Sequence, residues 1–487
     1  MLQNIKELPS KDFSGGLNTT SIFNIQPNET PDAINVKYNV DGSMQKRPGY
    51  IRKALASSSG FGIFDYGVAT INNVIVACGT GVFYTTDLGA SYVQIQTGKS
   101  ASITHFNRIK DYAIYTDDAY DPPYYWTGSS TTQMELIAPG SAPACRFTLD
   151  FQGYGLFMNH TANTLKIYYQ DANTLLSGRY VDYFTLAPAE RSDAITGGTV
   201  LNNKAYVFTK YKIFRLTYVG GNPDFAYTPV KSFGFVPGAY DKVNMGESEF
   251  IVGLCYDKRI RVFDGGDDKV ISDKIEFDNG VCPFHLIDIQ DNAIEKSSSV
   301  KDTTEQVWKL NLCMAPSNYP THTLCLDLRS LSYYVYQYSS KFVGMVMTES
   351  ANKQYLVSLN TQGHVCQMNT SNTDETTPIT EYHTSPTLYD QSPSKVNKTA
   401  KIDFFFATGS CNNVYLEDRT NFDNAWKTRE TFLITNDSTK NQIKKAVDIP
   451  LTFNAYQYKI SSSSGTAEAW KLTKADVLMN SKGYGQG

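Results

Sequence analysis

The strongest constraint on the fold is a unit of about 40 residues that recurs along the chain. In each unit, short runs of alternating apolar and polar residues are separated by turn-forming residues, and helical periodicity is nearly absent. Residues 66–95, for example, contain four such runs separated by turns at Asn72-Asn73, Gly79–Gly81 and Asp87–Gly89. The pattern returns in six further units, at 103–138, 145–186, 194–230, 240–277, 307–338 and 342–368. Each unit predicts a sheet of four short antiparallel strands.

A four-stranded sheet cannot bury both of its faces alone, so the units must pack against one another. Closing such a series into a ring also removes the exposed sheet edges. Three hairpins within the units share one design, an apolar strand followed by a short polar turn and a second strand, at 204–216, 250–263 and 355–368. We therefore predict an all-β protein built around a β-propeller of about six to eight four-stranded blades, with seven as the best count. Two stacked β-sandwiches are the structural alternative.

Three segments are predicted along the chain. Residues 1–54 show little apolar periodicity and are predicted to form an extended N-terminal arm. Residues 55–390 contain the repeated units and are predicted to form the propeller. Between residues 369 and 400 the sequence becomes polar and contains three prolines, which indicates a boundary or a long surface strand. Residues 391–487 return to the strand pattern and are predicted to form a C-terminal β-unit, either a sandwich-like module or a closing blade.

Composition supports strands and argues against a surface that grips nucleic acid. The 487 residues include 33 Tyr and 26 Phe, which favour half-buried strands and can fill subunit interfaces. The formal net charge is −4, and the tightest basic pairs, Lys46-Arg47 and Lys444-Lys445, are interpreted as ordinary solvated positions. Because binding to nucleic acid needs clustered Lys and Arg, no such surface is predicted.

The cysteines are isolated and show neither zinc-binding nor redox spacing. Several lie in apolar runs, so they are predicted to be small buried core residues of a protein made in a reducing cytoplasm. The eight are Cys78, Cys145, Cys255, Cys282, Cys313, Cys325, Cys366 and Cys411. The N-terminal sequence has no apolar segment of a signal peptide, and no run approaches the roughly 18 apolar residues of a membrane span, so neither is expected.

One local motif has a mechanical interpretation. Thr85–Tyr92 resembles the Asp-box, a Ser-x-Asp-x-Gly-x-Thr-Trp sequence that folds a hairpin turn. Asp87 is expected to accept backbone N–H bonds, Gly89 to adopt a left-handed conformation and Tyr92 to pack beneath the turn. In the families that carry the box it lies away from any active site. This single imperfect copy therefore supports a propeller and does not indicate catalysis.

Other motifs favour structural roles over chemical ones. A sialidase-like glycosidase would need an arginine triad, a tyrosine nucleophile and acidic residues, but the arginines are scattered. The run Asp264–Asp268 lacks calcium-loop spacing, and Gly98-Lys99-Ser100 lacks the first glycine of a phosphate loop. The arginines include Arg108, Arg146, Arg179, Arg191, Arg215, Arg259 and Arg261, and the histidines, never paired at metal-ligand spacing, are His105, His160, His285, His322, His364 and His383. We predict that the chain is not an enzyme and has no catalytic, cofactor-binding or metal-binding residues and no cofactor.

The N-terminal segment carries the sharpest indication of function. Asp12–Thr19 has the sequence Asp-Phe-Ser-Gly-Gly-Leu-Asn-Thr, Ile25–Val36 contains Pro27, Glu29 and Asn35, and Asp41–Tyr50 ends in Arg-Pro-Gly-Tyr. This series resembles the opening of the tail nozzle, tail tubular and hub β-propeller proteins of short-tailed bacteriophages. Residues 205–216 and 232–265 also resemble propeller blades of these proteins, and the resemblance weakens after about residue 390.

The same residues have a physical interpretation that does not depend on the resemblance. Gly15-Gly16 and Arg47-Pro48-Gly49 interrupt an extended arm that cannot fold alone. Such an arm must satisfy its backbone at a sheet edge, either in its own ring or in a neighbouring subunit. The Arg-Pro-Gly sequence also suits a tight turn into the first blade, and the two interpretations are compatible.

The resemblance implies a structural virion protein of the tail, synthesised in the host bacterial cytoplasm. It implies a homo-oligomer, a hexameric nozzle or hub ring, that contacts other tail proteins such as the adaptor and the tail fibre or spike. Viral DNA would be retained in the channel and pass through it at ejection without sequence-specific binding. The net charge of −4 predicts a neutral to acidic ring lumen and weak binding to free duplex DNA. The alternative function is a carbohydrate- or receptor-binding propeller, with Tyr120–Trp126 as its candidate aromatic cluster.

Overall fold

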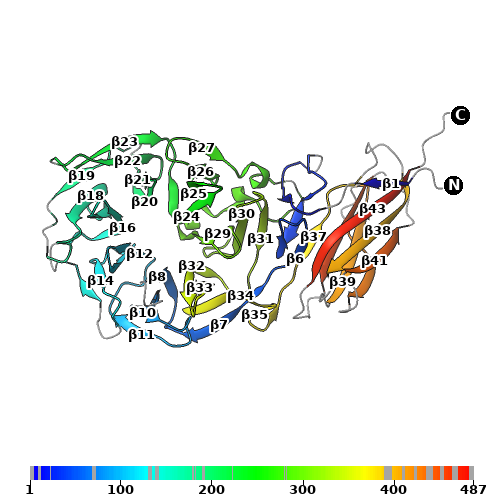
Figure 1. Ribbon diagram of the computed structural model, residues 1–487, viewed down its shortest axis with the longest axis horizontal. Coiled ribbons are helices and arrows are strands. Elements are labelled where there is room, and N and C mark those ends of the chain that lie inside the picture. The colour runs from blue at the N-terminus through cyan, green and yellow to red at the C-terminus, as the bar shows by residue number, and fades with distance from the viewer. Residues whose placement is uncertain are drawn as a thin grey trace.

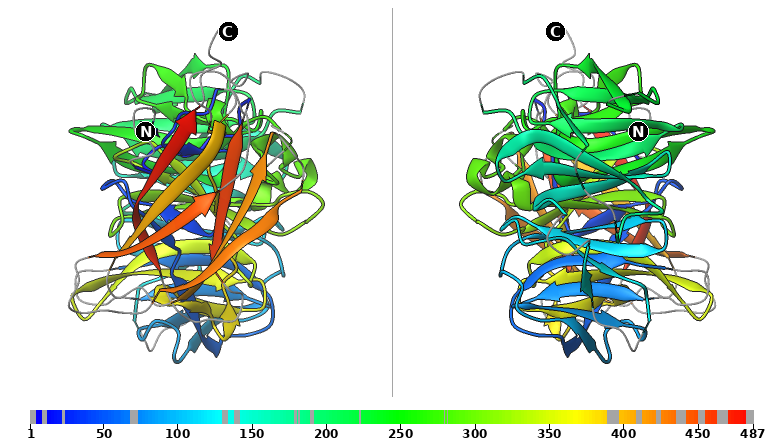
Figure 2. Two further views of the ribbon diagram at one scale, coloured as in Figure 1. Left: turned by 90° about the vertical axis from the view of Figure 1, so that its right-hand side faces the viewer. Right: turned by 90° about the vertical axis from the view of Figure 1, so that its left-hand side faces the viewer.

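The structure is a computed structural model, shown in Figures 1 and 2. It describes residues 5–8, 12–21, 24–67, 73–129, 134–137, 142–177, 180, 182–188, 192–221, 223–278, 280, 282–388, 397–407, 412–421, 425–434, 442–449, 455–462 and 470–481. A ring of sheets forms one end of an elongated molecule, a second group of strands forms the other, and N-terminal residues lie between them (Figure 1). The helices of this described part are three short 3-10 helices, η1 (Asp273–Ile275), η2 (Leu286–Asp288) and η3 (Asp291–Lys296). The predicted all-β class is confirmed.

Seven antiparallel four-stranded blades form the ring within the described ranges, which confirms the predicted propeller and its blade count. Blade 1 consists of β8 (Gly60–Asp65), β9 (Val74–Cys78), β10 (Gly81–Thr85) and β11 (Val93–Gln96). Blade 2 consists of β12 (Thr104–Ile109), β13 (Tyr112–Asp117), β14 (Tyr124–Trp126) and β15 (Glu135–Leu136). Blade 3 consists of β16 (Cys145–Phe151), β17 (Tyr154–His160), β18 (Asn163–Asp171) and β19 (Tyr183–Thr185).

The next three blades continue the same order along the chain. Blade 4 consists of β20 (Ile195–Leu201), β21 (Lys204–Thr209), β22 (Ile213–Tyr218) and β23 (Phe225–Lys231). Blade 5 consists of β24 (Phe235–Met245), β25 (Ser248–Cys255), β26 (Ile260–Phe263) and β27 (Asp268–Val270). Blade 6 consists of β28 (Ser298–Asp302), β29 (Val307–Leu312), β30 (His322–Asp327) and β31 (Tyr333–Tyr336). The hairpins predicted at 204–216 and 250–263 are the middle strands of blades 4 and 5.

Blade 7 combines strands from two distant parts of the chain. β32 (Phe342–Ser350), β33 (Lys353–Asn360) and β34 (His364–Ser371) supply three strands, and β7 (Gly49–Leu55) pairs antiparallel with β34 as the fourth. The short strands β35 (Thr373–Asp374) and β36 (Thr377–Pro378) extend this sheet beyond β7. The ring is therefore closed by a strand that precedes blade 1 in the sequence.

The first strand of every blade lies against the first strands of both neighbouring blades, so β8, β12, β16, β20, β24, β28 and β32 form a closed circle. Small residues permit this approach. A Cβ at Gly62 of β8 would lie 2.6 Å from the carbonyl oxygen of Thr104, and one at Gly344 of β32 would lie 2.8 Å from Cγ2 of Ile63. Outward from this circle, apolar side chains of adjacent blades share buried clusters, which is how each blade covers the faces of its neighbours.

Two sheets form the second body, and both include N-terminal strands. Their C-terminal strands, orange and red, face the viewer in the left view of Figure 2. The first sheet contains β41 (Gln442–Ile449), β38 (Asn397–Ala407), β43 (Lys471–Ser481), β6 (Met44–Lys46) and β5 (Val36–Tyr38), and β1 (Ile5–Leu8) also pairs with β43. The second sheet contains β4 (Asp32–Ile34), β37 (Tyr382–Thr384), β42 (Tyr456–Ser462), β39 (Asn412–Thr420) and β40 (Lys427–Ile434). Ile402, Phe404 and Phe406 are buried at every second position of β38 and share one core with Leu416 of the other sheet. We refer to this body as the sandwich.

Three strand positions differ from the sequence predictions. The boundary drawn at residue 54 falls within β7, because the end of the arm is the closing strand of blade 7. In blade 1 the first strand is Gly60–Asp65, before the run predicted from residue 66, and residues 68–72 lie outside the described residues. In blade 6 the first strand, Ser298–Asp302, precedes the predicted unit at 307–338. The inner strands β8 and β28 line the ring axis and carry Gly60 and Gly62 or Ser298 and Ser299 where the prediction looked for larger apolar residues.

Candidate functional site

The motif residues of the N-terminal arm lie at the junction of the propeller and the sandwich. Phe13, Leu17, Glu29, Asn35 and Arg47 are all buried there. The arm also contributes β2 (Gly16–Leu17), which pairs parallel with β3 (Glu29–Thr30) and lies against β31 of blade 6. The arm thus satisfies its backbone within its own chain, one of the two arrangements that the sequence left open.

The first part of the motif holds the arm to the end of blade 5. Nδ2 of Asn18 donates to Oε2 of Glu29 at 2.7 Å, and Oε1 of Glu29 pairs with Nζ of Lys274 in η1 at 2.7 Å. Gly16 has a φ of +69°, and a Cβ there would lie 2.6 Å from the carbonyl oxygen of Tyr333. Both the left-handed backbone and the close approach to blade 6 therefore require glycine at this position.

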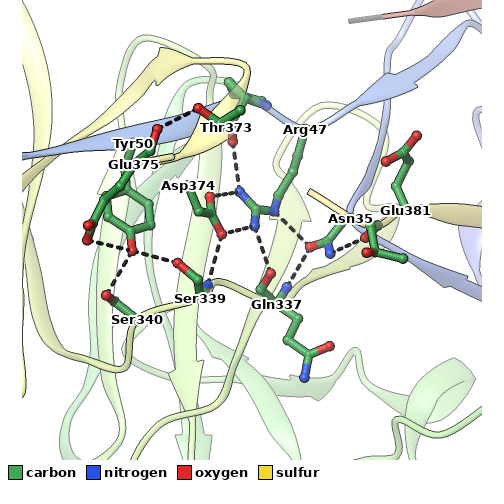
Figure 3. A network of polar contacts seen from close by, with 12 residues as sticks. Asn35, Arg47, Tyr50, Gln337, Ser339, Ser340, Thr373, Asp374, Glu375 and Glu381 are labelled. Carbon is green, nitrogen blue, oxygen red and sulfur yellow. Dashed lines mark hydrogen bonds and ion pairs between the residues drawn. The ribbon is translucent and has the colours of Figure 1, made fainter. Parts of the chain in front are cut away.

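Arg47 is the centre of the second contact (Figure 3). Its guanidinium binds the Asp374 carboxylate through two hydrogen bonds, Nη1 to Oδ1 at 2.8 Å and Nη2 to Oδ2 at 2.6 Å. Nε donates to Oδ1 of Asn35 at 2.7 Å, and Nη2 also donates to the carbonyl oxygen of Gln337 at 2.7 Å. The guanidinium carbon lies 4.1 Å from the centre of the Tyr338 ring. One side chain thus connects the arm, the segment after β31 and β35.

The electrostatics of this contact depend on complete pairing. Burial alone would lower the pKa of Arg47, but the hydrogen bonds and charge of Asp374 outweigh it and raise the pKa above its ordinary value. Asp374 also accepts a hydrogen bond from the backbone N–H of Ser339 at 2.9 Å. Only arginine offers a planar fork that matches a carboxylate in two places while bonding a third acceptor. We therefore interpret Arg47 as a residue that fixes the geometry of the junction.

The rest of the Arg-Pro-Gly-Tyr sequence contacts the same region. A Cβ at Gly49 would lie 1.9 Å from the carbonyl oxygen of Thr373, so no larger residue fits between β7 and β35. The Tyr50 hydroxyl lies 2.8 Å from Oγ of both Ser339 and Ser340 (Figure 3). Burial raises the pKa of Tyr50 to about 12, so it remains a neutral hydrogen-bonding group.

Lys46 joins the arm to the sandwich. Its Nζ lies 3.7 Å from Oε2 of Glu381, and Oε1 of Glu381 accepts a hydrogen bond from the indole N–H of Trp470 at 2.8 Å. Burial lowers the pKa of Lys46, and burial also raises the pKa of Glu381. The interpretation of Lys46-Arg47 as a solvated basic pair is wrong, because both side chains are paired with buried carboxylates.

A third buried charge cluster joins the arm to blade 6. Nζ of Lys37 lies 2.6 Å from Oε1 of Glu305, and the fully buried Lys309 lies 3.1 Å from the other oxygen of Glu305 and 2.8 Å from Asp302. Burial alone would lower the pKa of Lys309, but Glu305 and Asp302 raise it, so this lysine stays charged. Three cations of the arm, Lys37, Lys46 and Arg47, thus meet carboxylates from three separate segments.

The channel of the propeller contains a cavity of about 830 Å³. Its wall includes Phe61, Phe106 and Tyr240 together with hydroxyl-bearing residues such as Thr199 and Ser299. Side chains of the inner circle also bridge neighbouring blades around it. The bridges include Asn107 Nδ2 to the Thr148 carbonyl oxygen (2.5 Å), Thr196 Oγ1 to the Phe235 carbonyl oxygen (2.7 Å) and Ser299 Oγ to Asp241 Oδ2 (2.7 Å).

Charged side chains from several blades meet at the rim of this cavity. Asp118 accepts from Nε of Arg146 at 2.7 Å and lies 2.7 Å from Nε2 of His105. Glu295 of η3 pairs with Arg146 at 3.4 Å and with Lys210 at 3.3 Å. Burial would raise the pKa of both carboxyl groups, but these cationic partners lower it, so Asp118 and Glu295 are ionised and their charges are balanced within the rim.

The predicted Asp-box turn forms between β10 and β11. Oδ1 of Asp87 accepts hydrogen bonds from the backbone N–H of Ser91 at 2.9 Å and from the Thr85 hydroxyl at 2.7 Å. Gly89 has a φ of +91°, and its carbonyl oxygen accepts a hydrogen bond from the backbone N–H of Ala54 in β7 at 3.0 Å. Tyr92 packs against the cluster between blades 1 and 7. The turn is confirmed, and it also helps to seat the strand that closes the ring.

Several other candidates from the sequence are separated or buried. The described cysteines, Cys78 to Cys366, are all buried, as predicted, and Cys411 lies outside the described residues. Trp126 is fully buried against Tyr66 and Tyr84, whereas Tyr120, Tyr124 and Tyr125 are half-buried, so the tryptophan of the cluster considered for sugar binding does not reach the surface.

The residues considered for catalysis or metal binding are also separated in space or form turns. Arg108, Arg146 and Arg215 lie on blades 2, 3 and 4, while Arg179 and Arg191 lie outside the described residues. Asp264 accepts bonds from the backbone N–H groups of Gly266 and Asp267, which makes its run a turn between β26 and β27. Among the residues that the structure describes, no three His, Cys, Asp or Glu side chains gather where they could hold a metal ion. The same residues include no helix that is long and apolar enough to span a membrane.

No protein-family model and no curated protein matches this sequence. Among solved structures, the chain is similar to the N-terminal domain of Nup159 (TM-score 0.40, 10% identity, 69% of this chain and 98% of that chain). It is also similar to the extracellular domain of BT4673 from B. thetaiotaomicron (TM-score 0.44, 10% identity, 91% of this chain and 61% of that chain) and to BBS1N in complex with ARL6DN (TM-score 0.37, 9% identity, 66% and 97%). These likenesses concern the fold alone.

Proposed function

We propose that this chain is a structural protein of a bacteriophage tail, a nozzle or hub subunit without enzymatic activity. The observation that carries the proposal is the use made of the N-terminal motif. Asn18, Glu29, Asn35 and Arg47, which belong to the resemblance with tail proteins, are also the residues that hold the arm between propeller and sandwich. The motif therefore describes a rigid joint between two bodies, which suits a subunit that carries mechanical load in an assembly.

In this proposal several copies, six by the resemblance, form a ring that surrounds viral DNA and contacts adaptor and fibre or spike proteins of the virion. The propeller channel of one copy is occupied by inner-strand side chains and a cavity of only about 830 Å³, so the DNA conduit would be the space between copies. A net charge of −4 per copy favours passage without retention by phosphate contacts. DNA would be held back by other tail components or by loops at the ring.

Electron microscopy of the purified full-length chain tests the proposal. We expect closed rings with a central hole, formed by the chain alone or together with adaptor protein. The Arg47→Met variant should give fewer closed rings than Arg108→Met, which removes a partly exposed arginine of blade 2. A monomer at every concentration, with and without tail proteins, would contradict the proposal. So would micromolar binding to duplex DNA that weakens steeply with salt, because that behaviour indicates a clamp and not a conduit.

A carbohydrate- or receptor-binding propeller is the second candidate function. The tryptophan of the aromatic cluster first considered for it is buried and the tyrosines are half-buried, but the channel cavity has the volume of ordinary ligand pockets, which is about 300–1,000 Å³. Binding at this cavity and assembly into a tail are compatible, so the cavity is considered separately below.

A further inference from the structure

We propose that the cavity in the propeller channel binds an acidic saccharide, with its carboxylate held by Lys296 and Lys341 and a sugar ring packed on Tyr319. This site is distinct from the arm junction and does not depend on the tail proposal. Three independent features of the cavity carry the inference: the charge at its rim, the exposed ring beside that charge and the hydroxyl groups of its wall.

Lys296 lines the cavity and Lys341 lies near the Tyr319 ring, and neither lysine has a carboxylate partner among the described residues. Nζ of Lys296, the last residue of η3, lies 4.7 Å from the centre of the Tyr319 ring, and Nζ of Lys341 lies 5.8 Å from the same centre. Lys296 donates a hydrogen bond to the carbonyl oxygen of Asn318 at 3.0 Å, and neither lysine forms an ion pair with a described residue. Their position contrasts with Arg146 and Lys210, whose charges are balanced by Asp118 and Glu295.

Two cations near one aromatic ring, neither of them in an ion pair with a described residue, favour a bound anion. An anion with a single carboxylate can reach both ammonium groups at the ring without breaking an existing ion pair. The other lysine of the cavity wall, Lys242, is already paired with Glu249 at 3.4 Å. The free positive charge is thus confined to one part of the rim.

Tyr319 gives the site an apolar surface. Its side chain is 47% exposed although it borders the cavity, and it belongs to the segment between β29 and β30. Phe61, Phe106 and Tyr240 continue this aromatic character into the channel. The apolar C–H face of a sugar ring packs on such surfaces, whereas a bare inorganic anion gains nothing from them.

The wall also carries hydrogen-bonding groups. Thr199 and Ser298 line the cavity, and both residues are half-buried and bear a hydroxyl group. A hydroxyl group can donate one hydrogen bond and accept two, so this wall matches a ligand that carries many hydroxyl groups. Cations, an aromatic face and hydroxyl-bearing wall residues together match a sugar with one carboxylate, and the volume admits roughly one or two rings.

Calorimetric titration of the full chain tests the site, with D-glucuronic acid as the probe and D-glucose and inorganic phosphate as comparators. We expect saturable binding of glucuronate that weakens with ionic strength and exceeds glucose binding by about fivefold or more. The double variant Lys296→Gln/Lys341→Gln should lose roughly 5- to 25-fold in affinity for glucuronate, and Tyr319→Ala should weaken both sugars. Lys269→Gln, on the outermost strand of blade 5, is the matched control and should bind like the native chain.

Each other outcome overturns part of the proposal. Equal binding of glucose and glucuronate that the double variant leaves unchanged would exclude a cationic subsite. Phosphate binding as tight as glucuronate binding, unaffected by Tyr319→Ala, would indicate a general anion site and exclude a saccharide. Absence of saturable binding by both sugars would overturn the site altogether. Circular dichroism of the variants, whose altered side chains are partly exposed, verifies that the fold is retained.

Discussion

The propeller and the sandwich use the N-terminal arm to different extents. The propeller takes one strand, β7, and its other six blades are each continuous in sequence. The sandwich takes β1, β4, β5 and β6, so both of its sheets contain residues from the two ends of the chain. In the propeller most strand pairs are local hairpins, whereas in the sandwich β4 pairs with β37 about 350 positions away. One body can therefore form blade by blade, but the other requires the whole chain.

The largest expected effect comes from deleting residues 1–40, which removes β1 to β5 and the buried Ala33, Val36 and Tyr38. We expect amide hydrogens of β38, β42 and β43 to exchange much faster in this variant, while those of blades 2 to 4 remain protected. Hydrogen exchange followed by mass spectrometry measures both regions in one sample. Deleting residues 1–11 removes β1 alone and should leave the sandwich largely protected. Equal protection of the sandwich in the full chain and in the longer deletion would show that the two bodies do not differ in this way.

The second prediction concerns the joint itself. Arg47→Met leaves the buried Asp374 carboxylate without its cation, which should lower the free energy of unfolding by about 3–5 kcal/mol. The double variant Arg47→Met/Asp374→Leu removes both charges and should recover a substantial part of that loss. Chemical denaturation monitored by tyrosine and tryptophan fluorescence measures both variants. Native stability in Arg47→Met would mean that the Arg47–Asp374 pair does not hold the two bodies together.

The third prediction concerns the pH dependence of the arm and sandwich. Burial raises the pKa of Asp32 from 3.8 to about 6, although Tyr382 donates a hydrogen bond to it at 3.0 Å. Because the folded-state pKa is above the unfolded one, the neutral acid stabilises the fold fully below pH 4, and this contribution is lost as the pH rises through 6. Asp32→Asn keeps an acceptor for Tyr382 but cannot ionise. It should match the native chain near pH 4 and be more stable by up to about 2 kcal/mol at pH 8.

One pH profile would contradict the prediction for Asp32. An unchanged difference between Asp32→Asn and the native chain from pH 4 to pH 8 would show that the Asp32 carboxyl group is solvated and titrates normally. Blade 3 provides the internal comparison, because its hydrogen-exchange protection should be the same in both proteins at each pH.

The two regions also differ in what their sequences reveal. Strands β21 and β22 of blade 4 are apolar and adjacent, so the hairpin was predictable from alternation and turn residues. Strand β28, with the sequence Ser-Ser-Val-Lys-Asp, lines the channel and has no such alternation, so its position was missed. The C-terminal strands were predictable as β-structure, but not their pairing with the arm.

The candidate sites illustrate the same limit. Arg47 stood out because it belongs to a recognisable motif, yet its partner Asp374 is 327 positions away in a polar segment without a motif. Lys296, Tyr319 and Lys341 are ordinary surface residues in the sequence and meet because blades 6 and 7 pack side by side. Local sequence patterns do not predict such contacts, because folding brings together residues that are far apart in the sequence and share no pattern.

The smallest expected effect concerns the Asp-box, which provides an exposed counterpart to Arg47. Asp87→Ala removes the carboxylate that accepts hydrogen bonds from Ser91 and Thr85. Because the turn is exposed to solvent, water can replace part of these hydrogen bonds. We expect a loss of about 1 kcal/mol in the free energy of unfolding, well below that of Arg47→Met, together with faster amide exchange at Ala54, whose N–H donates to Gly89 across the ring closure. Asp87→Asn retains one acceptor oxygen and should lie between Asp87→Ala and the native chain. A loss in Asp87→Ala as large as that in Arg47→Met would mean that closure of the ring, and not the joint to the sandwich, limits the stability of the molecule.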